Sequence, residues 1–375
     1  MIIELEELVK NGEIEIKTGP FGTQLKAAEY VESGTPVLNV KNLGYSTVVT
    51  TKVDYVGEKT LERLSMHILK EGDIVFGRKG AVDRHAYIGA NEAGWMQGSD
   101  CIRLRVKTNK INPRYLSYYF LTPKHKAFMI SMCSHGTTMA SLNQGILSKI
   151  EIDLPERCIQ DRIVSIIAVL DKKRKTNEKL NKNLEQQAQA IYSRMFIEHR
   201  QESWSTGQLS DLISVKYGKD HKKLADGNYP VYGSGGIMRY VEKPLYTGES
   251  VLIPRKGTLN NIMYVNEAFW SVDTMFYTEM LRPNIAKFVY HFVKSKDLVS
   301  LNAGSAVPSM TTNILNAMQL YIPNEKTLEK FENIVSPMYS AMQENTKESK
   351  ILANTRDALL PKLMSGELDV SDIDL

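Results

Sequence analysis

The segment HGTTMASLNQGILSKIEIDLP, residues 135–155, recurs 168 positions later as AGSAVPSMTTNILNAMQLYIP, residues 303–323. A repeat of this kind predicts two copies of one fold within a single chain. The matched positions are Gly136 with Gly304, Ser141 with Ser309, Ile146 with Ile314, Leu147 with Leu315, Ile152 with Leu320, Leu154 with Ile322 and Pro155 with Pro323.

A second repeat lies upstream of the first. GDIVFGRKGAV at 72–82 aligns with GESVLIPRKGTL at 248–259, and each copy has an arginine and a lysine directly before a glycine. The offset falls from 177 at these glycines to 168 downstream, so the second copy has nine fewer residues between the blocks. Such length differences are typical of surface loops on a shared scaffold. The sequence therefore predicts two modules of one fold.

The composition is that of a globular protein with more than one core. The chain has 375 residues, 42% hydrophobic and 24% charged, which suffices for at least two domains. The net charge of +4 permits a polyanionic partner without requiring one. No apolar run approaches the roughly 18 residues of a membrane span, and the start MIIELEELVK lacks the basic region of an export signal. We therefore expect no membrane association and a cytoplasmic location.

The cysteines give no sign of a disulfide framework or a metal site. There are three, Cys101, Cys133 and Cys158, and no pair has the CxxC spacing of a structural zinc site. An odd number of scattered cysteines fits a reducing compartment. We expect this chain to bind no metal.

Each downstream repeat is followed by a segment suited to a long helix. Residues 156–199 contain no glycine or proline, and their apolar residues recur at alternating spacings of four and three, as in a coiled-coil seam. Residues 324–366 have equivalent apolar positions at the offset of 168. The two helices would most simply pair antiparallel; the alternative is that each packs alone on its own module. The predicted helix-pairing residues are Ile159, Ile163, Ile166, Leu170, Asn177, Leu180, Leu184 and Ile191, and Phe331, Ile334, Met338, Asn345, Leu352 and Leu359.

Three features modify the long segments. Pro337 predicts a kink or the start of a new helical segment, and Pro361 predicts the last turns of the second helix. The basic run KKRKTNEK at 172–179 either meets DNA or an acidic partner, or is a solvated helix face. The closing GELDVSDIDL has four acids and no base, which indicates a mobile tail or a partner-docking peptide.

The modules themselves mix short strands with helices. Strand-like runs are TPVLNV (35–40), GDIVFG (72–77), DCIRLRV (100–106), SVLIP (250–254) and TMFYTEML (274–281). Helical runs lie at 112–132, interrupted near Pro123, and at 284–295. The predicted fold class is α+β, with two similar mixed α/β modules separated by two long helices that form an antiparallel coiled coil, a pseudo-twofold internal repeat. The expected boundaries are 1–155 and 201–323 for the modules, 156–200 and 324–366 for the helices, and 367–375 for the acidic tail.

Four segments in order resemble the specificity subunit of type I restriction-modification systems. They are TGPFGTQLKAAEYVESGTPVLNVKNL (18–43), the long stretch LNQGILSKIEIDLPERCIQD through AIYSRMF (142–196), YPVYGSGGIMRYVEKPLYTGESVLIPRKG (229–257) and RDALLPKLMSGEL (356–368). The resemblance covers essentially the whole chain, in the family's order of target recognition domain, helix, target recognition domain, helix. Two features of the second copy depart from this pattern. The second copy has AGSAVPS where the first has HGTTMAS, and Pro337 interrupts its helix.

The resemblance implies a protein that reads DNA and has no chemistry of its own. Each target recognition domain would read one half of a split site on double-stranded DNA, and the helices would set the gap between the halves. Two methyltransferase subunits would bind the chain and methylate adenine at N6 after flipping the base. Restriction-translocase subunits would complete a nuclease. No cofactor is expected on this chain, while S-adenosylmethionine, ATP and Mg²⁺ are expected on the partner subunits.

The repeated RKG turns are the first candidates for DNA contact. Gly80 and Gly257 let the backbone turn and approach a ligand closely. The neighbouring arginine and lysine suit phosphates or guanine edges, since both present N–H donors. The alternative is a solvated hairpin tip whose basic side chains contact nothing.

The small polar loops 134–141 and 302–309 are further candidates, with a tight structural turn as the alternative. The predicted DNA-binding residues of the first module are Lys17, Gln24, Arg78, Lys79, Arg84, His135, Thr137, Thr138 and Ser141. Those of the second module are Lys216, Lys219, Tyr232, Arg239, Arg255, Lys256, Asn260, Ser305 and Ser309. Lys26, His85, Gln97, Lys222 and Asn261 are weaker candidates of the same kind, and simple solvent exposure is the alternative for each residue outside the turns.

Two other classes of function compete with a DNA reader. An adenine methyltransferase would need an Asn/Asp-Pro-Pro-aromatic loop, but the chain contains no Pro-Pro, and Gly218-Lys219 is followed by Asp220 rather than the Ser or Thr of a phosphate-binding loop. Glu15-Ile16-Lys17 matches a nuclease fragment without the second acidic ligand. A coiled-coil scaffold whose modules bind protein remains, and it predicts no sequence-selective duplex binding.

Overall fold

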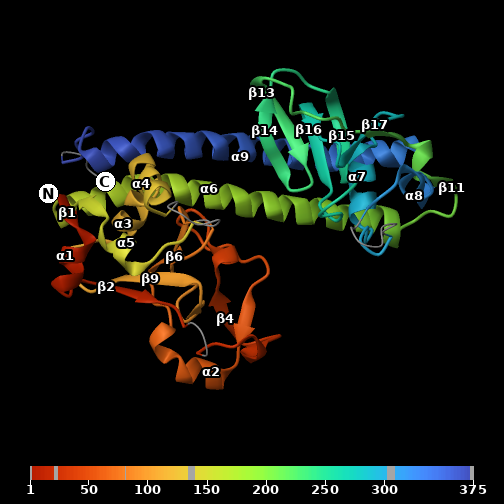
Figure 1. Cartoon of the computed structure of the whole chain (residues 1–375). Helices are drawn as coiled ribbons and strands as arrows, with labels where there is room; N and C mark the ends of the chain where they lie inside the picture. Colours follow the sequence, from red (N-terminus) through yellow and green to blue (C-terminus); the bar gives the residue numbers. More distant parts are fainter. Residues whose placement is uncertain (1, 21–23, 81, 134–139, 302–308, 372–375) are drawn as a thin grey trace. The chain divides into compact units, whose positions relative to one another are not determined.

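The computed structural model describes residues 2–20, 24–80, 82–133, 140–301 and 309–371. The chain divides into two compact units, one made of Met1–Thr176 with Glu348–Leu375 and the other of Asn177–Lys347. Both divisions fall inside the long helices. Each unit therefore contains one module together with a stretch of each helix (Figure 1).

The module of the first unit is built on two four-stranded sheets. The first sheet is antiparallel and has the order β2-β9-β6-β7, and the second has the order β3-β5-β4-β8. A separate pair joins β1 to β10. The strands are β1 (Ile2–Glu4), β2 (Ile14–Thr18), β3 (Tyr30–Val31), β4 (Thr35–Leu38), β5 (Asp54–Val56), β6 (Ile74–Gly77), β7 (His85–Tyr87), β8 (Met96–Gln97), β9 (Cys101–Val106) and β10 (Glu151–Asp153). The helices are α1 (Leu5–Lys10), α2 (Glu58–Arg63), α3 (Pro113–Tyr119), α4 (Pro123–Cys133) and α5 (Gln144–Ser148).

The module of the second unit is built on one six-stranded sheet with the order β12-β17-β15-β16-β13-β14. A separate pair joins β11 to β18. The strands are β11 (Ser205–Gln208), β12 (Ile213–Tyr217), β13 (Asp226–Gly233), β14 (Gly236–Val241), β15 (Tyr246–Pro254), β16 (Met263–Ser271), β17 (Met275–Met280) and β18 (Gln319–Ile322). The helices are α7 (Ala286–Lys294) and α8 (Thr312–Asn316).

The two modules repeat one topology. The order β2-β9-β6-β7 of the first corresponds to β12-β17-β15-β16 of the second. Each module also has one pair of parallel strands, β4 with β8 in the first and β13 with β16 in the second. The short helices α5 and α8 begin at equivalent caps, Asn143 and Thr311, whose side chains accept from the backbone N–H of Ile146 and Ile314. The predicted α+β repeat is confirmed.

The two long helices are α6 (Arg157–Tyr192) and α9 (Glu325–Ser365). Residues of high helix propensity, without internal glycine, account for their length. The last turns of the first predicted segment, Ser193–Glu198, are π-helical rather than α-helical. Gly366, with φ of +76°, ends α9 in the left-handed conformation that glycine accepts at low cost.

The helices run antiparallel within each unit (Figure 1). In the first unit Arg356 of α9 donates to Asp171 of α6 at 3.2 Å, and Lys173 pairs with Glu348 at 3.3 Å. In the second unit Asn181 of α6 donates to the carbonyl oxygen of Met342 at 3.2 Å. The predicted antiparallel pairing is therefore correct.

Most residues of the predicted seam are buried or half-buried, but two of them are exposed. Leu180 and Ile334 are 46% and 39% exposed, whereas their neighbours Asn181 and Val335 face the interior. The rungs that match are Ile163, Leu170, Asn177, Leu184, Phe331, Met338, Asn345, Leu352 and Leu359, all buried or half-buried. Ile159, Ile166 and Ile191 are half-buried at the edge of the seam. The buried positions 160, 163, 167, 177 and 188 of α6 fit a ladder with spacings of three and four, the reverse of the predicted order, and buried Tyr192 lies one residue beyond its last rung.

Pro337 does not start a new segment, because α9 is continuous through it. Loss of an N–H and the clash of the ring with the preceding turn cost about 3 kcal/mol in a helix. Pro337 is exposed, so water can reach the carbonyl that the ring leaves without its helical donor. Val335 and Tyr339, buried on the opposite face against the core of the second unit, offset the cost.

The acidic tail is docked as far as Ser371, the last residue described. Val370 is 2% exposed and belongs to the core of the first unit. Arg162 of α6 donates to the carbonyl oxygens of Val370, at 3.4 Å, and of Ser371. A wholly mobile tail is thus excluded over the described part.

In each unit, side-chain hydrogen bonds join the module to the long helices. In the first unit the Tyr118 hydroxyl of α3 donates to Asp171 at 3.0 Å. In the second unit Tyr290 and Lys294 of α7 both donate to Glu185 of α6. The Tyr339 hydroxyl of α9 meets the buried His291 ring at 2.9 Å. A tyrosine on the module's helix therefore meets an acid on α6 in both units.

Candidate nucleic-acid interface

The first RKG turn is held between two strand ends and the segment that leads into α5. The backbone N–H of Arg78 donates to the carbonyl oxygen of Asp100 at 2.8 Å, and the N–H of Leu142 donates to the carbonyl oxygen of Arg78 at 2.7 Å. Lys79 and Ser141 form an isolated antiparallel bridge. The turn and the predicted loop residue Ser141, far apart in the sequence, therefore lie together.

The second module builds the same arrangement. Arg255 N–H donates to the carbonyl oxygen of Thr274 at 2.9 Å, and Met310 N–H donates to the carbonyl oxygen of Arg255 at 2.9 Å. Lys256 and Ser309 form the equivalent bridge. Two independent stretches of sequence thus place Arg, Lys and Ser in one backbone setting.

The turns expose their lysines. Gly80 and Gly257 have φ of +77° and +88°, which lets the chain reverse directly after each lysine. Lys79 and Lys256 are exposed, and neither makes an ion pair with a described residue. Arg255 is half-buried, donates to the carbonyl oxygen of Asp273 at 3.3 Å and lies 5.4 Å from the ring centre of Tyr217. Each turn therefore presents an exposed lysine beside a half-buried arginine.

Strand ends bring a second lysine to each module. Lys17 and Lys216 occupy equivalent places near the ends of β2 and β12, two residues before Gly19 and Gly218. A Cβ on either glycine would lie 2.0 Å from a carbonyl oxygen, so both positions require glycine. Lys216 pairs weakly with Glu279, at 3.6 Å. Exposed Tyr217 stands where the first module has Thr18, a difference that the alignment of repeats did not single out.

The other predicted DNA-binding residues divide by exposure. Gln24, Arg84 and Lys219 are exposed. Arg239 pairs with Asp226 at 2.8 Å, and Asn260 uses its side chain to bind Asp297 and the N–H of Leu298. Tyr232 is 8% exposed and donates to Glu267 at 2.6 Å, so it is part of the module's interior. Predicted residues that fall outside the described part are His135, Thr137, Thr138 and Ser305.

Two weaker candidates are buried and were wrong. Gln97 is fully buried and donates to the carbonyl oxygens of Lys17 and Cys101, both at 3.0 Å. His85 is fully buried beside Phe76 and meets the Ser117 hydroxyl at 3.0 Å. Burial lowers the pKa of His85 to about 3, because a charged imidazolium would lose its hydration there. Both side chains support the strands instead of facing solvent.

One exposed cluster escaped the sequence analysis. Tyr45 is 42% exposed, and its hydroxyl donates to Asp83 at 2.8 Å. Lys126 and Arg84 approach its ring, at 4.6 and 5.5 Å from the ring centre. The residues come from three distant segments, so no spacing in the sequence could have signalled the cluster. An aromatic ring flanked by cations is a surface on which a base or sugar can pack.

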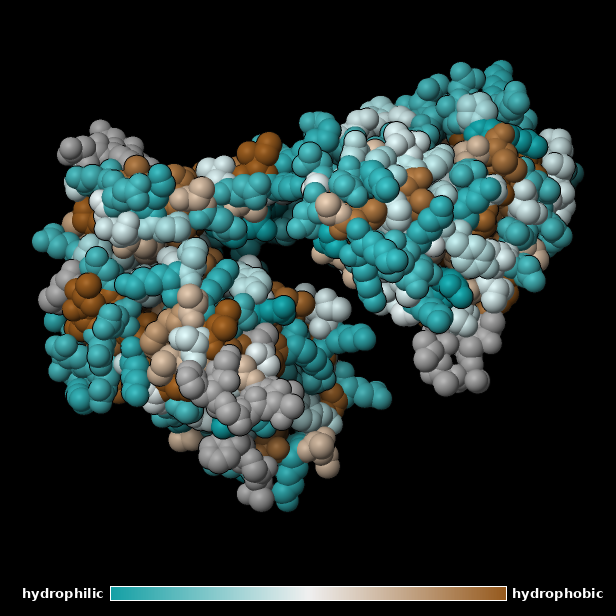
Figure 2. Space-filling view, turned by 45° about the horizontal axis from the view of Figure 1, so that its top comes forward, coloured by the Kyte–Doolittle hydropathy of each residue, from teal (hydrophilic) through white to brown (hydrophobic). Residues whose placement is uncertain are grey.

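Polar side chains cover most of the face seen in Figure 2, with hydrophobic residues in separate patches. Within the described residues no group of three or more His, Cys, Asp and Glu side chains is arranged to hold a metal ion. No described helix is both long and apolar enough to cross a membrane.

The family is decided by comparison of the sequence with known domains. The domain described as "Type I restriction modification DNA specificity domain" matches residues 7–186 and, a second time, residues 201–353. The chain belongs to this family. It is a type I specificity subunit with two copies of the DNA specificity domain, and the resemblance seen in its sequence is confirmed.

Relatives of this specificity subunit carry the same description. The type I restriction enzyme MjaIX specificity subunit of Methanocaldococcus jannaschii is 21% identical and aligns over 93% of this chain and 90% of its own length. The putative MjaX specificity subunit of the same organism is 25% identical over 90% and 88% of the two chains. The crystal structure of a type I restriction-modification S subunit from M. genitalium has the same fold, with a TM-score of 0.58 at 17% identity over 99% of this chain and 96% of that one.

Proposed function

We propose that each module of this specificity subunit reads one half of a split site on double-stranded DNA, with the paired helices holding the halves apart. The observation that carries the proposal is the repeated RKG turn, bridged in each module to an equivalent serine. A duplex has twofold axes, so one chain with two similar surfaces can address two half-sites.

The turns fit the chemistry of a DNA backbone and groove edge. Lys79 and Lys256 pair with no described acid, so neither has to break an ion pair before it binds a phosphate. Each phosphate so neutralised releases a counter-ion from the DNA, which favours binding. Arg78 and Arg255 are half-buried, and the guanidinium of Arg255 donates to the carbonyl oxygen of Asp273. Partly enclosed guanidinium groups suit contact with a base edge. We assign phosphate contact to the lysines and edge contact to the arginines.

The subunit works with others in this proposal. Two methyltransferase subunits carry S-adenosylmethionine and modify adenine, and restriction-translocase subunits carry ATP and Mg²⁺. The half-buried Asp171 and Glu185 support this division of labour, because their hydrogen bonds join each module to its helix stretch instead of forming a reactive centre. The basic run 172–179 stays a candidate for DNA or partner contact. Lys173 there already pairs with Glu348, while Lys172, Lys175 and Lys179 are exposed.

Duplex binding as a function of salt tests the proposal. A reader that makes several phosphate contacts loses affinity steeply, with a logarithmic slope of about 0.9 for each phosphate neutralised. The full chain with its methyltransferase subunits is titrated against a genomic duplex that contains the methylated motif and against a scrambled duplex. The proposal predicts a steep slope and preference for the motif. A flat slope without preference would instead support a protein-binding scaffold.

A further inference from the structure

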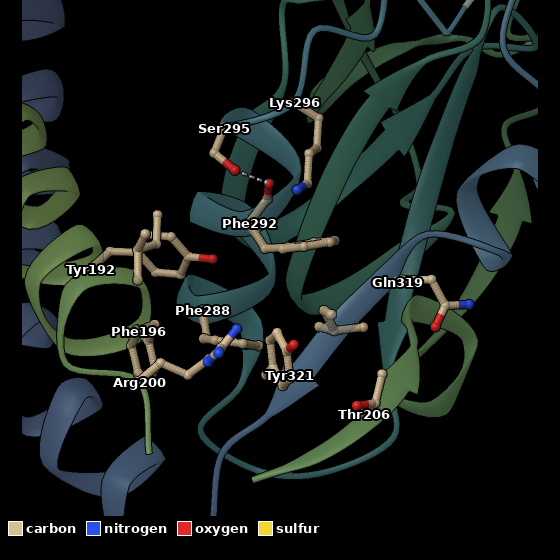
Figure 3. A pocket seen from close by; sticks show the side chains of 12 residues that line it. Tyr192, Phe196, Arg200, Thr206, Phe288, Phe292, Ser295, Lys296, Gln319 and Tyr321 are labelled. Carbon is tan, nitrogen blue, oxygen red and sulfur yellow. Dashed lines mark hydrogen bonds between the residues drawn. The ribbon is translucent and has the colours of Figure 1, made fainter. Parts of the chain in front are cut away.

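The second unit has a pocket of about 330 Å³ where α6 ends (Figure 3). Its walls come from the π-helical turn, from α7 and from the β11-β18 pair, all within that unit. Phe288, Phe292 and Tyr321 supply aromatic surface, and Ile197 at the rim is 58% exposed. A volume of this size matches the smaller ligand sites of proteins.

The π-helical turn shapes one wall of the pocket. One extra residue in the turn shifts the side chains that follow Tyr192, and such turns are frequent at functional sites. Phe196 is directed inward and packs edge-on against Phe288, with ring centres 4.8 Å apart. Ile197 and Arg200 then face the opening.

Tyr192 places a polar atom without a partner inside the pocket. The residue is 3% exposed, and its hydroxyl makes no hydrogen bond to a described residue. Figure 3 shows this hydroxyl directed into the space beside Phe292. Burial alone raises the pKa of the hydroxyl, so it stays protonated and available as a donor. The hydroxyl oxygen is accessible from the pocket rather than enclosed, so an acceptor atom on a ligand can reach it.

The rim of the pocket is positively charged. Arg200 lies 4.0 Å from the ring centre of Tyr321, and Lys296 lies 4.7 Å from that of Phe292. The twelve lining residues include no aspartate or glutamate. Neither cation forms an ion pair with a described residue, although Glu198 and Glu202 are nearby in the sequence. The complementary ligand has an apolar body and a negative charge next to it.

We propose that this pocket receives an aromatic or aliphatic side chain, flanked by Asp or Glu, from a methyltransferase subunit. This inference rests on the proposed function for the identity of the partner, a methyltransferase subunit. The apolar side chain lies against Phe288 and Phe292, its backbone carbonyl accepts from Tyr192, and the neighbouring carboxylate meets Arg200 and Lys296. A basic or wholly polar segment would leave these groups uncompensated.

Association of the full chain with its methyltransferase subunit, measured by surface-immobilised titration, tests the site. Arg200→Glu and Lys296→Glu each reverse one rim charge and should weaken association about tenfold. Tyr192→Phe removes only the hydroxyl and should weaken it about fivefold. Lys243→Glu reverses an exposed charge in the turn between β14 and β15, outside the lining, and should change nothing. Unchanged thermal unfolding shows that each variant is folded, and association equal to wild type in all three pocket variants would overturn the proposal.

A photo-crosslinker in place of Ile197 identifies the occupant in the assembled complex. The captured methyltransferase peptide should contain an apolar residue with an acid within two positions. Capture of a basic segment, or no capture in a complex that forms normally, would contradict the site. Duplex binding is measured on the same samples. Lost DNA selectivity with an intact pocket effect would count against the DNA-reading proposal alone, so the two outcomes are distinguishable.

Discussion

Asn177 of α6 donates an amide hydrogen to the carbonyl oxygen of Asn345 of α9, at 3.3 Å. The two asparagines are equivalent positions of the duplicated sequence, 168 residues apart. Equivalent residues of antiparallel helices meet at the point about which the pairing is symmetric. Asn345 in turn donates to Asn181 at 2.9 Å. A polar cluster at this point fixes the register of the two helices, as a buried asparagine does in coiled coils.

Replacing Asn177 by alanine should therefore lower the free energy of unfolding by about 1 kcal/mol, the typical value of one hydrogen bond. Urea unfolding followed by circular dichroism measures the change. Asn354→Ala, on an exposed position of α9, serves as the matched control and should be within about 0.5 kcal/mol of wild type. Equal effects of both substitutions would show that the asparagine cluster contributes nothing to the pairing.

The corrected seam predicts that two similar truncations differ widely. Ile163 is 2% exposed between the helices and the first module, so Ile163→Ala should cost about 2–5 kcal/mol through lost burial and the cavity left behind. Leu180 is 46% exposed, and Leu180→Ala should cost less than about 1 kcal/mol. Denaturant midpoints compare the two. A large loss at Leu180 would restore the seam first expected from the sequence.

Buried histidines predict acid sensitivity of the first unit. Burial lowers the pKa values of His85 and His125 to about 3, whereas in the unfolded chain both stay near 6.5. Below pH 6.5 the unfolded state therefore binds more protons, and the free energy of unfolding falls by about 1.4 kcal/mol per pH unit for each histidine until about pH 3. His125→Gln should reduce that slope by one histidine's share, measured by urea unfolding at several pH values. The exposed His199→Gln is the control, and equal slopes for His125→Gln and wild type would contradict the assignment.

If both basic turns contact phosphates, removing the lysine of either turn should weaken DNA binding to a similar extent. Lys79→Ala and Lys256→Ala should each weaken duplex binding and reduce the logarithmic salt slope by about 0.9, because each removes one phosphate contact. Lys59→Ala removes an exposed lysine of α2 and should leave the slope unchanged. Binding isotherms of the assembled complex at several salt concentrations give the slopes. An effect at one turn only would mean that the two modules do not use the repeat alike.

The sequence predicted the repeat, the strand segments and the antiparallel helices, because these depend on local pattern. Repeated glycines and apolar spacing are visible without a structure. It failed where three-dimensional packing decides between neighbours. Leu180 was predicted in the seam because it is hydrophobic. In the structure Asn181 faces α9 instead, where its side chain hydrogen-bonds to Met342 and Thr346. Pro337 looked like a break, but buried side chains on both sides of it carry the helix through.

The candidate site shows the same division. The RKG turns are visible as a repeated sequence motif. Their proximity to Ser141 and Ser309 depends on β-bridges between residues 62 and 53 positions apart, which the sequence does not reveal. Some predicted contact residues have hydrogen-bonding groups that suit DNA but form hydrogen bonds inside their own module, namely His85, Gln97 and Tyr232. Residue type alone cannot report burial. The cluster around Tyr45 and the pocket beside Tyr192 join segments too distant for any sequence motif.

The most direct test of the central claim is a map of methylated adenines in DNA from cells that make this subunit with its methyltransferase. Exchanging residues 1–155 for the first module of another specificity subunit should change one half of a split motif and leave the other half and the gap intact. A motif that is unchanged by the exchange, or one that changes in both halves, would contradict the assignment of one half-site to each module.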